Sequence, residues 1–202
     1  FIFDWYWFDG GPFLESALNE GFLKARNRDR MQFYLMWANH DVRRNYWNVH
    51  KFKDDASVMW GGAVDRKNFD AVVDRVIRQY FKQPNYFKIG GRPVFSIFHI
   101  KNLIDGLGGM ESAKEALGHF RRATQAAGFP GLHLQLIGNG APRPEVVEQI
   151  RQLGADSVTK YNWGGRTQRT ISAGARRPWS GGGNGTRPSR SRIFPMPRSG
   201  GT

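Results

Sequence analysis

Short apolar stretches that end in polar residues recur along the chain. The clearest is FYLMWANHD, residues 33–41, in which an apolar and aromatic run stops at Asn39, His40 and Asp41. Such stretches are too short and too aromatic to favour a helix, so they predict strands. Five strands are predicted in this way, over residues 1–8, 31–39, 93–100, 132–139 and 156–163.

Helical spacing of apolar residues fills the gaps between these strands. The clearest example is the segment 69–81, and similar patterns cover residues 13–24, 110–128 and 144–154. Strands that alternate with helices predict an α/β protein with a parallel sheet.

Two architectures fit this alternation, an open doubly wound sheet and part of an eight-stranded barrel. The turn FDGGPF lacks the GxGxxG spacing of a dinucleotide site, and no GKS or GKT occurs in the loops. Polar and aromatic residues instead gather at the carboxyl ends of several strands, where barrel enzymes build their sites. We therefore predict a partial (β/α)8 TIM-type barrel over residues 1–163, and we expect no cofactor.

The segment 164–202 has a different composition. It holds nine Gly, eight Arg and four Pro, with no Lys, Asp or Glu and no apolar periodicity. A segment that buries so little apolar surface cannot offset its chain entropy, so we predict a disordered Arg/Gly-rich tail. A frameshift artefact is another explanation, because its end, FPMPRSGGT, can be back-translated and read two nucleotides later as PHASVGWD. Nucleic-acid binding through the arginines, with a salt-sensitive affinity, is a third.

Charge and composition exclude several classes of protein. Eight of the thirteen net positive charges lie in the tail, which leaves +5 for residues 1–163 and weakens a nucleic-acid reading. There is no cysteine, and no apolar run is long enough for a membrane span. The chain starts in a strand-like run without an initiator Met, so we expect that its natural start is missing. Localisation and oligomeric state stay open.

Aromatic rings next to short polar groups suit a sugar, because the rings stack on its C–H faces while amides and carboxylates bind its hydroxyls. We therefore expect a glycan or polysaccharide partner, with no nucleic acid. For Trp5 and Trp7 a role in the core fits the pattern equally well. The predicted substrate-binding residues are Asp4, Trp5, Tyr6, Trp7, Trp37, Asn39, His40, Asp41, Tyr161 and Asn162.

Other chemistries find less support. His40, Asp41, His50 and His99 could in principle converge on a metal, but no HxH or HExxH spacing occurs and we expect no metal site. No GxSxG elbow for a serine nucleophile is present. Glycoside hydrolysis normally needs two carboxyl groups. The nearby candidates are Asp4, Asp9, Glu15 and Asp41, of which Asp4 and Asp41, with His40, are the candidates for a catalytic role. The sequence identifies no acidic pair.

Four segments resemble the glycoside hydrolase family 99-like proteins, which include the WbsX-like proteins of polysaccharide gene clusters. They are FDWYWFDGGPFLESAL, FYLMWANHD, GRPVFSIF and DSVTKYNW, in the family's order and at similar spacing. The resemblance implies a (β/α)8 barrel that acts on complex glycans or helps to assemble them. Endo-acting cleavage of α-mannosides is the best-known activity of that group.

Two departures from the family's pattern limit what the resemblance implies. Many relatives have Glu, in a WANENW pattern, where this chain has His40. The family's acidic motif, of the form WNEWxEG, lies near the end of its barrel and does not occur here. We therefore expect a substrate-binding fragment of a glycoside hydrolase that is inactive by itself. A non-hydrolytic WbsX-like role in surface polysaccharide biosynthesis is the alternative.

Overall fold

A computed structural model describes residues 1–138 and 143–161. The protein is a mixed α/β structure with a mostly parallel central sheet. Each of its five main strands pairs in parallel with the next one in chain order. They overlap the five predicted segments, with β7 beginning one residue before its segment, and are β1 (Ile2–Phe8), β3 (Tyr34–Trp37), β7 (Arg92–Ile97), β8 (His133–Ile137) and β9 (Ser157–Thr159).

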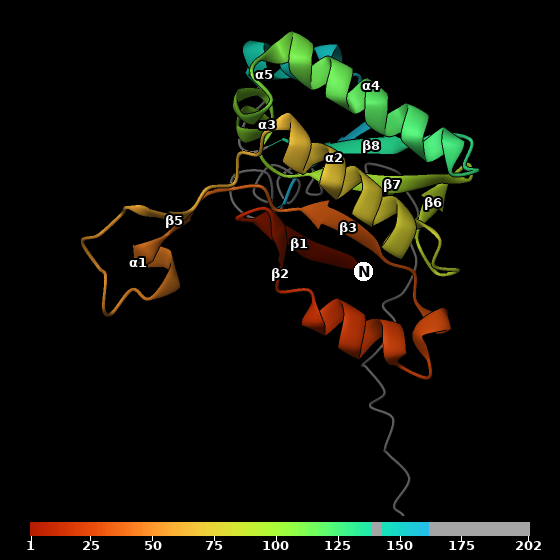
Figure 1. Cartoon of the computed structure of the whole chain (residues 1–202), viewed down its shortest axis with the longest axis horizontal. Coiled ribbons are helices and arrows are strands. Elements are labelled where there is room, and N and C mark those ends of the chain that lie inside the picture. The colour runs from red at the N-terminus through yellow and green to blue at the C-terminus, as the bar shows by residue number, and fades with distance from the viewer. Residues whose placement is uncertain (139–142, 162–202) are drawn as a thin grey trace, which may run out of the picture. The chain divides into compact units, whose positions relative to one another are not determined.

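Shorter strands that the pattern did not predict extend this framework. β2 (Gly11–Phe13) pairs antiparallel with the end of β1, and β6 (Lys88–Ile89) pairs antiparallel with β7. β4 (Val42–Arg43) and β5 (Val58–Trp60) form a separate hairpin that contains α1 (Arg44–Trp47) and projects from the main sheet (Figure 1).

The helices alternate with the main strands as predicted. α2 begins after Asp65, whose carboxylate accepts the backbone N–H of Asn68 at 2.8 Å, as an N-cap should. α4 ends next to Gly128, which has φ +94°, the left-handed conformation common after a helix. The helical segments are η1 (Ala17–Gly21), η2 (Phe22–Lys24), η3 (Arg28–Arg30), α2 (Arg66–Arg75), η4 (Val76–Phe81), α3 (Ile100–Gly106), α4 (Met110–Ala126) and α5 (Pro144–Gln152).

One face of the sheet packs against the helices and forms the core. α2 and α4 run across this face (Figure 1). Phe120 of α4 lies 5.3 Å from Phe95 of β7 and 6.2 Å from Phe69 of α2, measured between ring centroids. The strand residues of this face are Trp5, Trp7, Leu35, Trp37, Phe95, Ile97, Leu134 and Leu136, all buried.

The alternate strand residues form the other face of the sheet, which we call the concave face. Register aligns Asp4, Met36, Ser96, Gln135 and Ser157 in one row across the five strands. The hydroxyl of Tyr161, just after β9, donates to Asp4 of β1 at 3.0 Å, although four strand spacings separate these strands. In a flat sheet that would be about 19 Å, so the sheet curls toward this face.

The predicted disordered tail, residues 164–202, lies outside the described residues. In the part of the chain that the structure describes, no helix is long and apolar enough to cross a membrane.

Candidate functional site

Five side chains meet on the concave face, near the carboxyl ends of the strands, and we call them the rim cluster. Asp4 and Tyr6 come from β1, and His40, Phe98 and Tyr161 follow β3, β7 and β9. Ring centroids are 6.1 Å apart for Tyr6 and His40, 5.6 Å for His40 and Phe98, and 5.5 Å for Phe98 and Tyr161, each pair edge to face. The Tyr161–Asp4 hydrogen bond connects the last ring to the carboxylate.

The carboxylate of Asp4 is the negative charge of this cluster. It is exposed, and no ion pair within residues 1–138 and 143–161 involves it. Burial, and then the charge of Asp4, raises the pKa of Tyr6. The hydrogen bond to Asp4 and its charge raise the pKa of Tyr161. Both phenols are therefore neutral near pH 7. Tyr6 can donate a hydrogen bond to a ligand, whereas Tyr161 donates its proton to Asp4 and can accept a hydrogen bond from a ligand hydroxyl.

A cavity of about 410 Å³ opens beside this carboxylate. Met36 and Ile137 form part of its apolar wall and belong to a small cluster with Ala38, against which Tyr6 and Phe98 pack. A volume of this size is in the usual range for a small-ligand site. The cavity is lined by Ile2, Phe3, Asp4, Met36, Ile137, Thr159, Lys160 and Tyr161.

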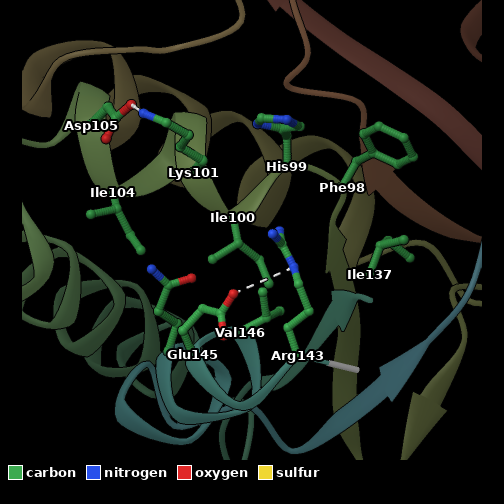
Figure 2. Close-up of a pocket in the computed structure, with 11 residues that line it drawn as sticks. Phe98, His99, Ile100, Lys101, Ile104, Asp105, Ile137, Arg143, Glu145 and Val146 are labelled. Carbon is green, nitrogen blue, oxygen red and sulfur yellow. Dashed lines mark hydrogen bonds and ion pairs between the residues drawn. The ribbon is translucent and has the colours of Figure 1, made fainter. Parts of the chain in front are cut away.

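Two further hollows lie at the strand ends, and one of them shares a lining residue with this cavity. One, of about 380 Å³, is lined by His40, Asp41, Arg43, Tyr46, Phe98, His99 and Asn102. The other, of about 470 Å³, lies where α3 and α5 begin, and its lining includes both Phe98 and Ile137 (Figure 2). We count the cavity beside Asp4 as the first hollow and these two as the second and the third. Phe98 borders the second and third hollows, and Ile137 borders the first and third. The three hollows therefore form a series along the ends of β7 and β8.

Charges in the third hollow are paired. Arg143 lies 3.5 Å from Glu145, and Lys101 forms an ion pair with Asp105 (Figure 2). These pairs are solvent-exposed, so each contributes little to stability. The hollow has no excess charge from these four residues that would select an ionic ligand.

Asn39 holds two strand ends together. Its amide donates to the His99 carbonyl at 3.0 Å and accepts the His99 N–H at 2.7 Å. The side chain is only 1 % exposed. The structure therefore uses this predicted sugar ligand to join the end of β3 to the end of β7.

Asp41 and His99 are also engaged by the protein. Asp41 accepts hydrogen bonds from the backbone of Gly62 at 2.9 Å and from Asn102 at 3.2 Å. His99 Nδ1 accepts the backbone N–H of Asn102 and caps α3. Burial lowers the pKa of His99, against the opposing charge of Asp41, so its ring is neutral near pH 7.

The three tryptophans predicted to bind sugar lie on the opposite, helix-facing side of the sheet. Trp5 donates to Glu15 at 2.6 Å, Trp7 donates to Asn68 at 3.2 Å, and the Trp37 ring is fully buried. The reason is the two-residue period of a strand, which sends positions 5 and 7 away from positions 4 and 6. The structure favours the core role for all three, and we leave them out of the site.

Glu15 has the same placement, in the core beside Trp5, although the sequence suggested it as a carboxylate near the site. Asn162 lies outside the described residues. Conversely, five residues that line the cavities were not predicted from the sequence: Phe98, Met36, Ile137, Thr159 and Lys160. A signal was present in PVFSIFHI, because Ser96 and Phe98 alternate with the core residues Phe95 and Ile97.

Among the residues that the structure describes, no group of three or more His, Asp or Glu is placed to hold a metal ion. His50 is exposed in the segment between β4 and β5, whereas His40 and His99 lie at the strand ends.

Gly62 provides a test of how tightly the polar strand end is held. A Cβ at this position would lie 2.5 Å from the backbone of Asn39 and His40. We expect Gly62→Ala to lower the free energy of unfolding by about 2 kcal/mol, because backbone must move to relieve the overlap. Chemical denaturation measures this change, and Gly61→Ala, where a Cβ meets nothing within 4 Å, is the matched control. Equal stability of the two variants would contradict the close approach.

The chain matches one known family over most of its length. The family described as Glycosyltransferase WbsX matches residues 1–177, which runs past the domain boundary predicted at residue 163. No curated protein and no solved structure gives a match. The chain therefore belongs to the Glycosyltransferase WbsX family, a family of carbohydrate-active proteins.

Proposed function

We propose that the rim cluster and its adjoining cavities bind a glycan, and that residues 1–163 are the substrate-binding part of a (β/α)8 barrel enzyme of the glycoside hydrolase family 99-like group. The observation that carries this proposal is the convergence of Asp4, Tyr6, His40, Phe98 and Tyr161 on the concave face from four separate strands. Sugar sites need this combination of aromatic surface with a few placed polar groups.

The strand order supports the barrel. A doubly wound sheet reverses its strand order at a switch point, where its ligand binds. In the described sheet the five parallel strands follow one another in chain order without such a reversal. The curl that brings Tyr161 to Asp4 is the curvature that barrel closure requires. In a barrel, the carboxyl ends of the strands form the active-site face, and the rim cluster lies there.

In this proposal Asp4 is the carboxylate that contacts the substrate. Asp41 already accepts two hydrogen bonds from the protein, and Glu15 lies in the core. Hydrolysis by the usual route needs a second carboxyl group across the glycosidic bond. We propose that the family's acidic motif, on the later strands of the barrel, provides this second carboxyl group.

A second candidate is transfer of a sugar during polysaccharide assembly. The name of the family, Glycosyltransferase WbsX, favours it. Both candidates share the glycan-binding face and differ only in the group that receives the sugar. A binding experiment therefore tests the common part first.

The test is calorimetric titration of the full 202-residue chain with α-mannoside oligosaccharides. We expect Asp4→Asn to weaken binding at least tenfold, because a charged acceptor of sugar hydroxyls contributes roughly 1.5–3 kcal/mol. Tyr161→Phe should weaken it about threefold, through loss of one neutral hydrogen bond.

Asp29→Asn is the matched control, because this exposed aspartate lies in η3, outside the rim cluster. It should bind like the wild type. Unchanged affinity in both Asp4→Asn and Tyr161→Phe would place the glycan elsewhere and contradict the proposed site.

A further inference from the structure

We propose that the rim cluster prefers sugars that carry a free, protonated amino group over neutral or N-acetylated sugars. This inference rests on the proposed glycan function and names the substrate class of the same site. It comes from the exposed carboxylate of Asp4, which accepts the hydroxyl of Tyr161 and shares its strand face with Tyr6, while Phe98 packs edge to face on Tyr161.

The arrangement has the two elements that recognise an organic cation. Aromatic faces attract a cation through their quadrupole, most effectively when several rings surround it. Asp4 supplies the opposite charge, and its carboxylate lies within hydrogen-bond distance of the Tyr161 hydroxyl. A hydroxyl could donate the same hydrogen bonds to the carboxylate, but only an ammonium group gains from the negative charge and from the rings together.

The neighbouring cations form no ion pair with Asp4. Lys160 lines the same cavity, but among the described residues its ammonium lies more than 4 Å from the Asp4 carboxylate. Arg43, in the second hollow, donates to the carbonyl of Ala56 at 2.7 Å.

The net charge of the chain does not favour cationic ligands. Residues 1–163 carry a net charge of +5, so this part of the protein as a whole does not attract them. A preference for a cationic sugar therefore cannot come from long-range attraction. It requires a local negative site, and the rim cluster provides one.

The experiment compares glucosamine oligomers with N-acetylglucosamine oligomers of the same length, and with α-mannoside oligomers, on the full chain. The pH is set low enough to protonate the free amines. We expect the glucosamine oligomers to bind roughly tenfold more tightly than their acetylated counterparts, as one exposed ion pair and one exposed cation–π contact together allow. Asp4→Asn should abolish this preference, and Asp29→Asn should retain it.

The possible outcomes distinguish failure of the amine preference from failure of the proposed glycan binding. Equal affinity for glucosamine and N-acetylglucosamine oligomers would overturn the amine preference. If Asp4→Asn still weakens the binding of any of these glycans, the proposed glycan site remains in place. A preference that survives in Asp4→Asn would also overturn this inference, because the carboxylate would not be its source. Binding of no glycan at all would overturn both proposals.

Discussion

Glu15→Gln is expected to lower the free energy of unfolding by about 3 kcal/mol, because it removes the charge that Arg75 pairs with in the core. The Glu15 carboxylate accepts hydrogen bonds from Arg75 Nε at 2.9 Å, Tyr80 at 2.8 Å and Trp5 at 2.6 Å. Its side chain is only 10 % exposed and that of Arg75 is 30 % exposed. Glutamine keeps the volume of the side chain but leaves the guanidinium without its charged partner. Because water has partial access to Arg75, the expected loss of unfolding free energy is at the lower end of the range for buried ion pairs.

The loss should depend on pH in a defined direction. Burial alone would raise the pKa of Glu15, but the hydrogen bonds from Arg75, Trp5 and Tyr80 outweigh it and lower the pKa below its ordinary value of 4.5. A carboxyl whose pKa is lower in the folded state contributes its full stability above the unfolded pKa and loses it as the pH falls through the folded pKa. The difference between wild type and Glu15→Gln should therefore be constant above about pH 5.5 and shrink below pH 4.5.

Urea denaturation at several pH values measures this difference. Glu20→Gln is the control in the same segment, because Glu20 and its partner Lys24 are both exposed. It should change stability by less than about 0.5 kcal/mol. A Glu15→Gln variant as stable as Glu20→Gln would show that the buried pair contributes no net stability. A difference that does not shrink at all as the pH falls below 4.5 would show that it is not electrostatic.

The sequence was sufficient for the main strands and their alternation with helices, and the reason is local. Helical spacing of apolar residues, as in Phe69, Val72 and Val73, predicts a helix from neighbouring residues alone. The short apolar runs at 33–38 and 93–98 predict strands in the same way. The projecting hairpin from Val42 to Trp60 was not predicted, because its strands are only two and three residues long and show no period.

The candidate site was predicted only in part, because membership depends on which face of a strand a residue occupies. In FDWYWF the alternation is hidden, since both faces are aromatic: Tyr6 lies on the concave face while Trp5 and Trp7 fill the core. Asn39 looks like a sugar ligand from sequence, and only the fold reveals that the backbone of His99 occupies its amide. Such pairings across 60 residues leave no signature in a local pattern.

Phe120→Ala is expected to lower the free energy of unfolding by about 4 kcal/mol, because it removes a buried ring from the core. Phe120 is fully buried and stacks on Phe81 at 6.0 Å, while its edge-to-face contacts reach Phe69 and Phe95. Alanine would leave a cavity where α4, α2, η4 and β7 meet. Close packing limits how far these elements can collapse to fill it. Thermal and urea denaturation measure the loss, with Val147→Ala, at a half-exposed position on α5, as a control that should stay within about 0.5 kcal/mol.

The consequence should extend to the other side of the sheet. Phe120 packs on Phe95, and three residues later β7 presents Phe98 to the rim cluster. Because the rim cluster is assembled from four strands, a loosened helix layer should let those strands separate and weaken glycan binding even under conditions in which most molecules stay folded. Titration of Phe120→Ala with the glycan that the wild type binds, well below its unfolding transition, measures this coupling. Wild-type affinity in a strongly destabilised variant would mean that the curvature of the sheet is held by the strands alone, without the helices behind it.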